Sequence, residues 1–312
     1  MDKRAPSSRR LFNGILAAGL LASALSGCAG DASVPADGVD LRTNGGEVGA
    51  LAIRSWAAEG RERAVILALH GFGESGELTF AGAGPFWAAR GIAVYAPDQR
   101  GFGANPSRMR WPGGDALAAD AVALGRVLRA RHPGLPLVVV GHSMGGGVAL
   151  IAATRGLAAD GLVLAGPAIA GGAALNPVLR AGAFTMATLA PDRRWTGDGV
   201  VSIQPTDNIE AIRRALDDPR HFSDPSSREL WGLVRLMDAA AGLAPAVTTP
   251  TLTLMGARDE VLRPDRVRAV HQTIPGGVGF RVYPEGWHWL FSDLQAERVW
   301  RDVADFTLGL AP

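Results

Sequence analysis

Short, continuously apolar runs recur along this chain, and each of them ends at a turn. Runs this short and this apolar are typical of strands that are buried on both faces, as in a parallel sheet. Six such strands are predicted: Ala64–Leu69, Ile92–Ala96, Leu135–Val140, Gly161–Ala165, Thr251–Met255 and Gly279–Tyr283.

Stretches with helical periodicity separate these runs, and the alternation predicts an α/β fold built on a doubly wound sheet. Upstream, the regions around Leu41 and Ala50–Trp56 are interpreted as an antiparallel hairpin at the start of the domain. The expected helices are Asp115–Arg131, Met144–Arg155, Pro264–Gln272 and Ser292–Leu308.

The alternation stops between Pro167 and Pro250, where no buried strand is evident. Gly/Ala-rich turns come first, and helical periodicity follows over Asn208–Leu216 and Ser226–Ala241. Ligands bind at the carboxyl ends of the strands in open α/β sheets. We therefore predict a largely helical cap insertion over that edge, spanning residues 167–249.

The first 27 residues have the three-part layout of a secretory signal peptide. Basic residues are concentrated before an apolar stretch that runs from Leu11 to Leu25, and small residues follow. The apolar stretch is too short for a transmembrane helix. Residues 28–38 are then interpreted as a short polar tether, and residues 39–312 as the folded domain.

The segment Leu25-Ser26-Gly27-Cys28 resembles the lipobox of bacterial lipoproteins. In such leaders the cysteine is acylated and becomes the first residue of the mature chain, and several acyl chains give stable anchoring. This predicts an exported, lipid-anchored protein of the bacterial envelope, and Ala29 after Cys28 favours the outer membrane. Ordinary cleavage, for example after Ala24, is the alternative and would leave the protein unanchored.

Charge and cysteine content exclude several classes of function. The 31 basic and 30 acidic residues nearly cancel, so no basic surface for nucleic acid is expected. Cys28 is the only cysteine in the sequence, which excludes an internal disulfide and a zinc site built from cysteines.

Gly141-His142-Ser143-Met144-Gly145 fits the pattern G-x-S-x-G, which is short enough to arise by chance. Its setting is more informative, because it follows the apolar run Leu135–Val140 and precedes a helix-like stretch. A nucleophile elbow requires this strand-turn-helix setting, with small residues two positions before and after the serine because the turn is strained. Ser143 is therefore the predicted nucleophile.

A serine nucleophile needs a general base, and after an elbow of this kind the acid and then the histidine follow along the chain. His221 lies in the insertion, which favours a surface or cap role. His271 lies within a predicted helix, where a solvated side chain is the default. His288 follows the last predicted strand, on a loop at the same sheet edge as Ser143, and is the predicted base.

The orienting acid and the oxyanion donors are expected on loops at that same edge. Asp259 and Glu260 both qualify by position, because both follow the strand before the histidine loop. The predicted oxyanion donors are the backbone N–H groups of Met144, directly after the nucleophile, and of Phe72, after the first predicted parallel strand.

Other residues with reactive or charged side chains are expected to have structural roles. His70 is predicted to be packed and hydrogen-bonded beneath the site. Asp98 and Arg100 are interpreted as a turn tied by local hydrogen bonds, and Trp111 and Trp195 as packing residues.

Five motifs occur in order along residues 50–305: LHGFGES from Leu69, YAPDQRGFG from Tyr95, GHSMGG from Gly141, GARD from Gly256 and GWH from Gly286. Together they resemble the monoacylglycerol lipase and lysophospholipase branch of the α/β hydrolases. The resemblance implies the α/β-hydrolase fold, Asp259 rather than Glu260 as the acid, a helical cap, and no metal or other cofactor. The chain departs from this branch where Trp287 and Trp289 flank His288 with large aromatic side chains.

The expected function is hydrolysis of a carboxylic ester through an acyl-enzyme. The resemblance implies monoacylglycerols, lysophospholipids or similar single-chain lipids as substrates, met at a membrane surface through the lipid anchor. An aminopeptidase of the same fold is one alternative, which activity on aminoacyl arylamides would favour. A catalytically silent, lipid-binding envelope lipoprotein is the other, which failure of a fluorophosphonate probe to label the protein would favour.

Overall fold

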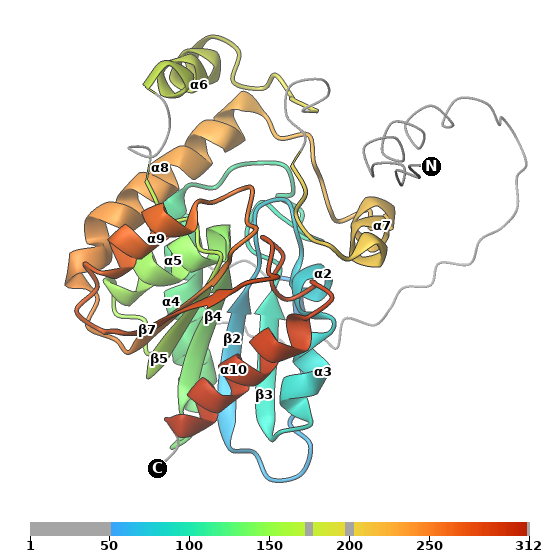
Figure 1. Ribbon diagram of the computed structural model, residues 1–312, viewed down its shortest axis with the longest axis vertical. Helices are drawn as coiled ribbons and strands as arrows, with labels where there is room; N and C mark the ends of the chain where they lie inside the picture. Colours follow the sequence, from blue (N-terminus) through green and yellow to red (C-terminus); the bar gives the residue numbers. More distant parts are fainter. Residues whose placement is uncertain (1–50, 172–176, 197–202, 311–312) are drawn as a thin grey trace, which may run out of the picture. The chain divides into compact units, whose positions relative to one another are not determined.

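A seven-stranded sheet forms the centre of the protein (Figure 1). The computed structural model describes residues 51–171, 177–196 and 203–310. The predicted leader, the tether and Cys28 lie outside these residues. In the strand order β1-β3-β2-β4-β5-β6-β7, β1 and β3 pair antiparallel and all other neighbours pair parallel. The strands are β1 Ile53–Trp56, β2 Ala64–Leu69, β3 Ile92–Pro97, β4 Leu137–His142, β5 Gly161–Ala165, β6 Thr251–Gly256 and β7 Gly277–Tyr283.

Every one of the six predicted parallel strands is present, and the expected α/β-hydrolase architecture is confirmed. The order of the sheet reverses direction after β3, as the doubly wound prediction requires. The helices are α2 Gly76–Phe80, α3 Ala83–Ala88, α4 Gly114–Arg131, α5 Met144–Ala153, α6 Pro177–Leu189, α7 Ile209–Asp217, α8 Ser227–Leu243, α9 Pro264–His271 and α10 Ala296–Gly309, with a 3₁₀ turn at Ala244–Ala246.

The apolar character of the central strands follows from burial of both faces of the sheet. Along β2, Val65 and Leu67 pack into one core layer, while Ile66 packs into the layer on the opposite face. Side chains alternate across a strand, so a strand covered on both sides needs apolar residues at every position. The first layer is filled by α4, α5 and α9, and the second by α2, α3 and α10.

Three helices were not predicted from the periodicity. The helices α2 and α3 are too short for a helical repeat to show, and α2 is instead marked by its N-cap, where Ser75 Oγ accepts from Leu78 N. The third, α6, is rich in alanine and glycine and was interpreted as turns. The helix predicted from Ser292 starts one turn too early, because α10 begins at Ala296.

The predicted hairpin at the start of the domain is not tested by the described residues. The strand β1 lies antiparallel to β3, with Ile53 opposite Pro97, and not beside a strand that precedes it among the described residues. The region around Leu41 lies outside those residues. An edge strand of this kind can find its partner far along the chain, so local periodicity does not identify the partner.

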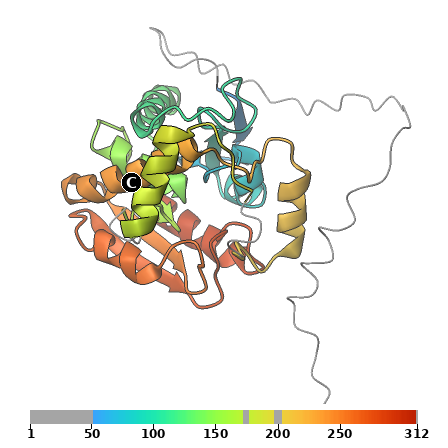
Figure 2. The ribbon, with the colours of Figure 1, turned by 90° about the horizontal axis from the view of Figure 1, so that it is seen from above.

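The insertion, defined here as the segment between β5 and β6, carries α6, α7 and α8 (Figures 1 and 2). The long helix α8 contacts both α5 and α6, so it joins the insertion to the helix that follows β4. It begins with a capping box, in which Ser226 Oγ accepts from Glu229 N and the Glu229 side chain accepts from Ser226 N. Within the described part of the chain, no helix is both long and apolar enough to cross a membrane.

Candidate active site

The turn between β4 and α5 has the strained backbone that the sequence motif predicts. Ser143 adopts φ +50° and ψ −115°, a conformation that non-glycine residues rarely occupy. A Cβ atom on Gly141 would collide with Gly145 O, and one on Gly145 would collide with Leu69 O. Glycine is therefore required at both positions, because the turn packs against itself and against the end of β2.

Three side chains meet above this turn in a continuous chain of hydrogen bonds. Ser143 Oγ lies 3.0 Å from His288 Nε2, and His288 Nδ1 lies 2.9 Å from Asp259 Oδ2. The Asp259 side chain is fully buried and the His288 side chain is 6% exposed. The other Asp259 oxygen accepts the N–H groups of Val261 and Leu262, both at 2.8 Å. The carboxylate is therefore fixed by its own loop, and its free oxygen is directed at the imidazole.

The structure distinguishes between the two acids that position alone left open. Asp259 contacts His288, whereas Glu260 Oε2 accepts the N–H of Gln204 at 2.8 Å. Glu260 thus links the acid loop to the segment of the insertion between α6 and α7. That segment is also bonded to the histidine loop, because Trp289 N donates to Pro205 O at 2.8 Å and Thr206 Oγ1 donates to Asp293 at 2.7 Å.

The backbone donors proposed for an oxyanion lie on the two segments that border Ser143. Met144 is the first residue of α5, so its N–H has no intrahelical partner. Phe72 lies on the loop after β2, and its ring packs against Phe102, Trp111 and Phe222, with ring centroids 5.3 to 6.2 Å apart. This aromatic cluster, to which the insertion contributes Phe222, holds the Phe72 loop in place.

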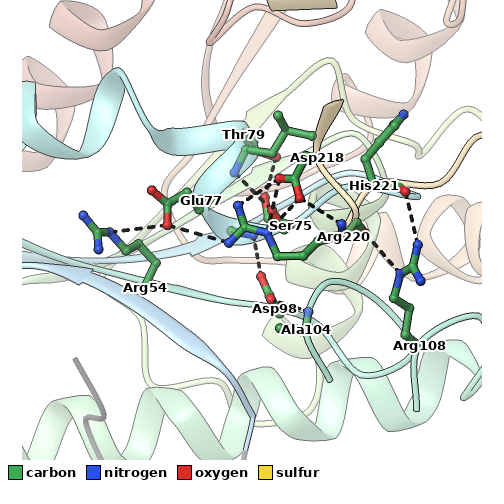
Figure 3. A network of polar contacts seen from close by, with 12 residues as sticks. Arg54, Ser75, Glu77, Thr79, Asp98, Ala104, Arg108, Asp218, Arg220 and His221 are labelled. Carbon is green, nitrogen blue, oxygen red and sulfur yellow. Dashed lines mark hydrogen bonds and ion pairs between the residues drawn. The ribbon is translucent and has the colours of Figure 1, made fainter. Parts of the chain in front are cut away.

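A polar network beside that loop also attaches the insertion to α2 and to the segment that carries Arg108 (Figure 3). The Arg220 guanidinium pairs with Asp218 at 2.9 Å and approaches Glu77 of α2 at 3.8 Å. Arg108 donates to the carbonyl oxygens of Arg220 and His221, at 3.4 and 3.2 Å. Because Phe222 N then donates to the carbonyl of Gly73 at 3.0 Å, the insertion is hydrogen-bonded to the Phe72 loop itself.

The remaining histidines divide between expected and unexpected positions. His70 is buried, and its two ring nitrogens bond Gly71 O at 2.7 Å and Gln99 N at 2.8 Å, as predicted for a structural residue. His221 is on the insertion, edge-on to Trp289. The expectation of a solvated His271 is wrong. Its ring is buried at the end of α9 and bonded to Thr253 at 3.0 Å, and burial lowers its pKa.

Asp98 and Arg100 do not form a pair with each other. Asp98 accepts the N–H groups of Gly76 and Ala104, at 2.8 and 2.7 Å, and so ties the turn after β3 to α2. Arg100 pairs instead with Asp120 of α4. Trp111 packs in the aromatic cluster, and Trp195 donates to Ser227 Oγ at 2.9 Å. These contacts agree with the structural roles predicted for these residues.

Buried charged groups beside the site were not singled out from the sequence. Glu74 and His142 lie 3.3 Å apart, next to the loops that carry Phe72 and His288. Asp293 accepts the N–H of Trp287 at 2.8 Å, and burial raises its pKa to about 6. One feature of the sequence points to the pair of Glu74 with His142. Glu74 lies in a loop of small and apolar residues after β2, where burial of an unpaired carboxylate would cost free energy.

No three metal-ligating side chains are grouped to hold an ion in the part of the chain that the structure describes. The site brings together a hydroxyl, an imidazole and a carboxylate in series. That arrangement can activate the hydroxyl as a nucleophile, because the imidazole can take its proton while the carboxylate stabilises the resulting charge.

Comparison with known proteins identifies relatives with the same organisation. Residues 60–295 match the family described as serine aminopeptidase, S33. The chain is 29% identical over 259 residues to a monoacylglycerol lipase of Mycolicibacterium smegmatis, an alignment that covers 81% of this chain and 91% of the relative.

Solved structures show the same fold at lower sequence identity. The monoacylglycerol lipase of Paleococcus ferrophilus superposes with a TM-score of 0.72 at 20% identity, covering 84% of this chain and 99% of that one. A thermostable carboxyl esterase from Bacillus coagulans superposes with a TM-score of 0.70 at 20% identity, covering 83% of this chain and 94% of that one.

Gly166, after β5, offers a test of how tightly the site is packed. It has φ +48°, and a Cβ atom there would lie 3.4 Å from His288 Nδ1 and 3.6 Å from Asp259 Oδ2. We expect Gly166→Ala to lower kcat on an ester about threefold, because the methyl group only just fits against the imidazole and relief of the strained φ would move it closer.

Gly156→Ala is the matched control, because Gly156 has φ +81° and nothing lies within 4 Å of the added Cβ. Both variants carry the backbone strain, which thermal unfolding would report, but only Gly166→Ala crowds the imidazole. Equal activity of the two variants would contradict the packing argument.

Proposed function

The chain belongs to the serine aminopeptidase S33 family, in the monoacylglycerol lipase-like branch of the α/β hydrolases, and from this membership we propose that it cleaves single-chain acyl esters. It is a carboxylic ester hydrolase. The finer proposal is a monoacylglycerol lipase or lysophospholipase that works at the bacterial envelope. The observation that carries the proposed hydrolysis is the unbroken hydrogen-bonded series from Ser143 through His288 to Asp259.

In the proposed reaction, His288 Nε2 takes the proton of Ser143 Oγ as the oxygen attacks the ester carbonyl. Asp259 keeps the other ring nitrogen protonated and stabilises the imidazolium that forms. The backbone N–H groups of Phe72 and Met144 stabilise the negative charge on the carbonyl oxygen. The tetrahedral intermediate then expels the alcohol, which takes the proton from His288, and leaves the acyl group on Ser143.

Water completes the cycle by the same route. His288, neutral again, removes a proton from a water molecule that attacks the acyl carbonyl, and a second tetrahedral intermediate forms. Its collapse breaks the bond to Ser143 Oγ, which regains a proton from His288, and the fatty acid leaves. No cofactor takes part in either half of the reaction.

A lipid substrate is supported by the named relatives and by the surface of α6. The relatives in Mycolicibacterium smegmatis and Paleococcus ferrophilus are monoacylglycerol lipases. No residue of α6 is buried, and four of its large apolar side chains are exposed: Val178, Leu179, Phe184 and Leu189. Exposed apolar side chains of this kind on the insertion suit contact with a lipid aggregate.

The envelope location is a proposal that rests on the leader. The lipobox-like Leu25-Ser26-Gly27-Cys28 would place the anchor at the start of the mature chain, with a polar tether of residues 28–38 before the folded domain. Acylation of Cys28 would hold the site close to the lipids that it hydrolyses. A mass spectrum of the mature N-terminal peptide, with and without Cys28→Ala, tests this directly.

The triad predicts different consequences for two adjacent carboxylates. We expect Asp259→Asn to lower kcat by about 10³ to 10⁴, because the imidazole loses the acceptor that holds its tautomer. Glu260→Gln is the matched control, and we expect a change of less than about threefold, because its partner is the backbone of Gln204. The reverse ranking of the two variants would overturn the assignment of the acid.

The substrate class is tested with p-nitrophenyl esters of two to sixteen carbons, monoacylglycerols, lysophospholipids and aminoacyl arylamides. We expect hydrolysis of the esters by the wild-type chain and a loss of at least about 10³-fold in Ser143→Ala. A preference for long single-chain lipids supports the finer proposal. Cleavage of arylamides but not esters would indicate a peptidase, and no labelling of folded protein by a fluorophosphonate would indicate a silent binding protein.

The role of α6 is tested by making its face polar. We expect Leu179→Ser with Leu189→Ser to reduce hydrolysis of monoacylglycerol in vesicles severalfold, because less apolar area is available for insertion, and to leave hydrolysis of soluble p-nitrophenyl acetate unchanged. Val278→Ser, at an exposed position of β7, is the control. Equal loss on both substrates would show that the change acts on folding and not on the lipid surface.

A further inference from the structure

A second histidine and carboxylate lie buried directly beneath the site, and the proposed reaction uses neither of them. His142 immediately precedes Ser143 at the end of β4, and its ring bridges two loops. Its Nδ1 lies 3.3 Å from Glu74 Oε2, and its Nε2 lies 3.0 Å from the main-chain oxygen of His288. The side chains of His142 and Glu74 are only 2% and 7% exposed.

The partners determine the protonation of the His142 ring. The His288 carbonyl can only accept, so Nε2 carries a proton. Glu74 Oε2 already accepts the hydroxyl of Thr79 at 2.5 Å and the N–H of Gly71 at 3.2 Å, which favours an ionised carboxylate. The proton between Glu74 and Nδ1 therefore resides on the ring, and both ring nitrogens of His142 are donors.

The electrostatic surroundings act in the same direction. Burial by itself raises the pKa of Glu74, but the charge and hydrogen bond of His142, with the Thr79 hydroxyl, outweigh it and hold that pKa at about 2. Burial by itself lowers the pKa of His142, but the charge and hydrogen bond of Glu74 outweigh it and raise that pKa above its ordinary value. The two groups thus stabilise each other as ions.

We propose that Glu74 and the His142 imidazolium form a buried ion pair that positions the catalytic histidine and keeps it unprotonated, an inference that rests on the proposed function. The pair connects the three parts of the site. Glu74 holds Gly71, next to Phe72 in the oxyanion loop, while His142 belongs to the nucleophile elbow and holds the main chain of His288. Both are positioning residues, because neither reaches the reacting atoms.

The two charges of this pair lie at different distances from the catalytic imidazole. The rings of His142 and His288 lie with centroids 5.2 Å apart, whereas Glu74 contacts the opposite nitrogen of His142. The charge of the pair that lies nearer the catalytic ring is therefore the positive one, which repels a second positive charge there. The other titratable or charged groups that face this region come from five further segments: His70, Asp98, Asp259, Asp293, Asp207 and Arg214.

Glu74→Gln separates the charge of the pair from its shape. The amide of glutamine fills the same volume, and its NH₂ group can donate to Nδ1 of a neutral His142, whose Nε2–H still reaches the His288 carbonyl, although the bond from Gly71 N–H is lost. We expect the acidic limb of the pH profile of kcat/KM to move up by about half to one pH unit. Above that limb, where His288 is neutral in both proteins, we expect kcat within about threefold of the wild-type value.

Glu62→Gln is the matched control. Glu62 Oε2 lies 2.9 Å from His132 Nδ1, so the same chemical change is made beside another histidine. Glu62 precedes β2 and His132 precedes β4, so this pair lies at the end of the sheet opposite the site. We expect the pH profile of Glu62→Gln to superimpose on that of the wild-type protein.

The protonation state is measured independently of activity. In the full-length protein labelled with ¹⁵N-histidine, we expect the NMR resonances of His142 to show two protonated ring nitrogens at pH 7, and one in Glu74→Gln. The wild-type spectrum is decisive even if the variant fails to fold. A neutral His142 in the wild-type protein at pH 7 would overturn the ion pair.

The pH dependence of fluorophosphonate labelling at Ser143 provides a further readout, because it reports the protonation of His288 without any assumption about the substrate. An unshifted labelling profile in a folded Glu74→Gln variant would overturn the role of the charge. Failure of the proposed function is distinguishable, since it would show as loss of ester hydrolysis while the labelling and the NMR spectra still report on the pair.

Discussion

The backbone of Ser143, held at φ +50° between β4 and α5, is the constraint on which the geometry of the site depends. This turn raises a single side chain at the carboxyl edge of the sheet, and it is possible only because Gly141 and Gly145 allow main-chain atoms to approach closely. The strain is offset by the surrounding structure. Ser143 N donates to Ala165 O at the end of β5, and Ser143 O accepts from Ala168 N beyond it.

The other parts of the site reach this turn from loops that are also tied to one another. The acid loop and the histidine loop are both bonded to the segment of the insertion between α6 and α7, through Glu260 and Trp289. The oxyanion loop is bonded to the insertion through Phe222. The two attachments therefore join the insertion to the acid loop, the histidine loop and the loop that carries Phe72. Changes of sequence in the insertion can consequently alter the geometry of the triad.

The site also contains more charge than the triad itself. Asp259 is paired with His288, which contacts Ser143. Glu74 is paired with His142, and both of those side chains are buried. A buried ion pair is weak evidence for stability, because desolvation offsets much of its attraction. Its presence here is better explained by position, since His142 is adjacent to Ser143 in the chain and is hydrogen-bonded to the main chain of His288. The proposed role of the Glu74–His142 pair is thus to act on the imidazole of His288, and not to stabilise the fold.

The amino-acid sequence by itself determined the strands, the α/β class and the strand-turn-helix setting of Ser143. These features depend on neighbours along the chain: an apolar run predicts a strand buried on both faces, and two glycines two positions from a serine permit a strained turn. The order of serine, acid and histidine predicted which three loops converge, although it left Asp259 and Glu260 both open. It did not predict the partner of β1, the helix α6, the burial of His271 or the pairing of Glu74 with His142. Those features were decided by the tertiary structure, because each rests on a contact between residues far apart in sequence. His142 and Glu74 are 68 positions apart, and His288 and Ser143 are 145 positions apart. Local patterns contain no information about which of several carboxylates or histidines will meet at such a distance, since that is determined by how the sheet and the insertion pack.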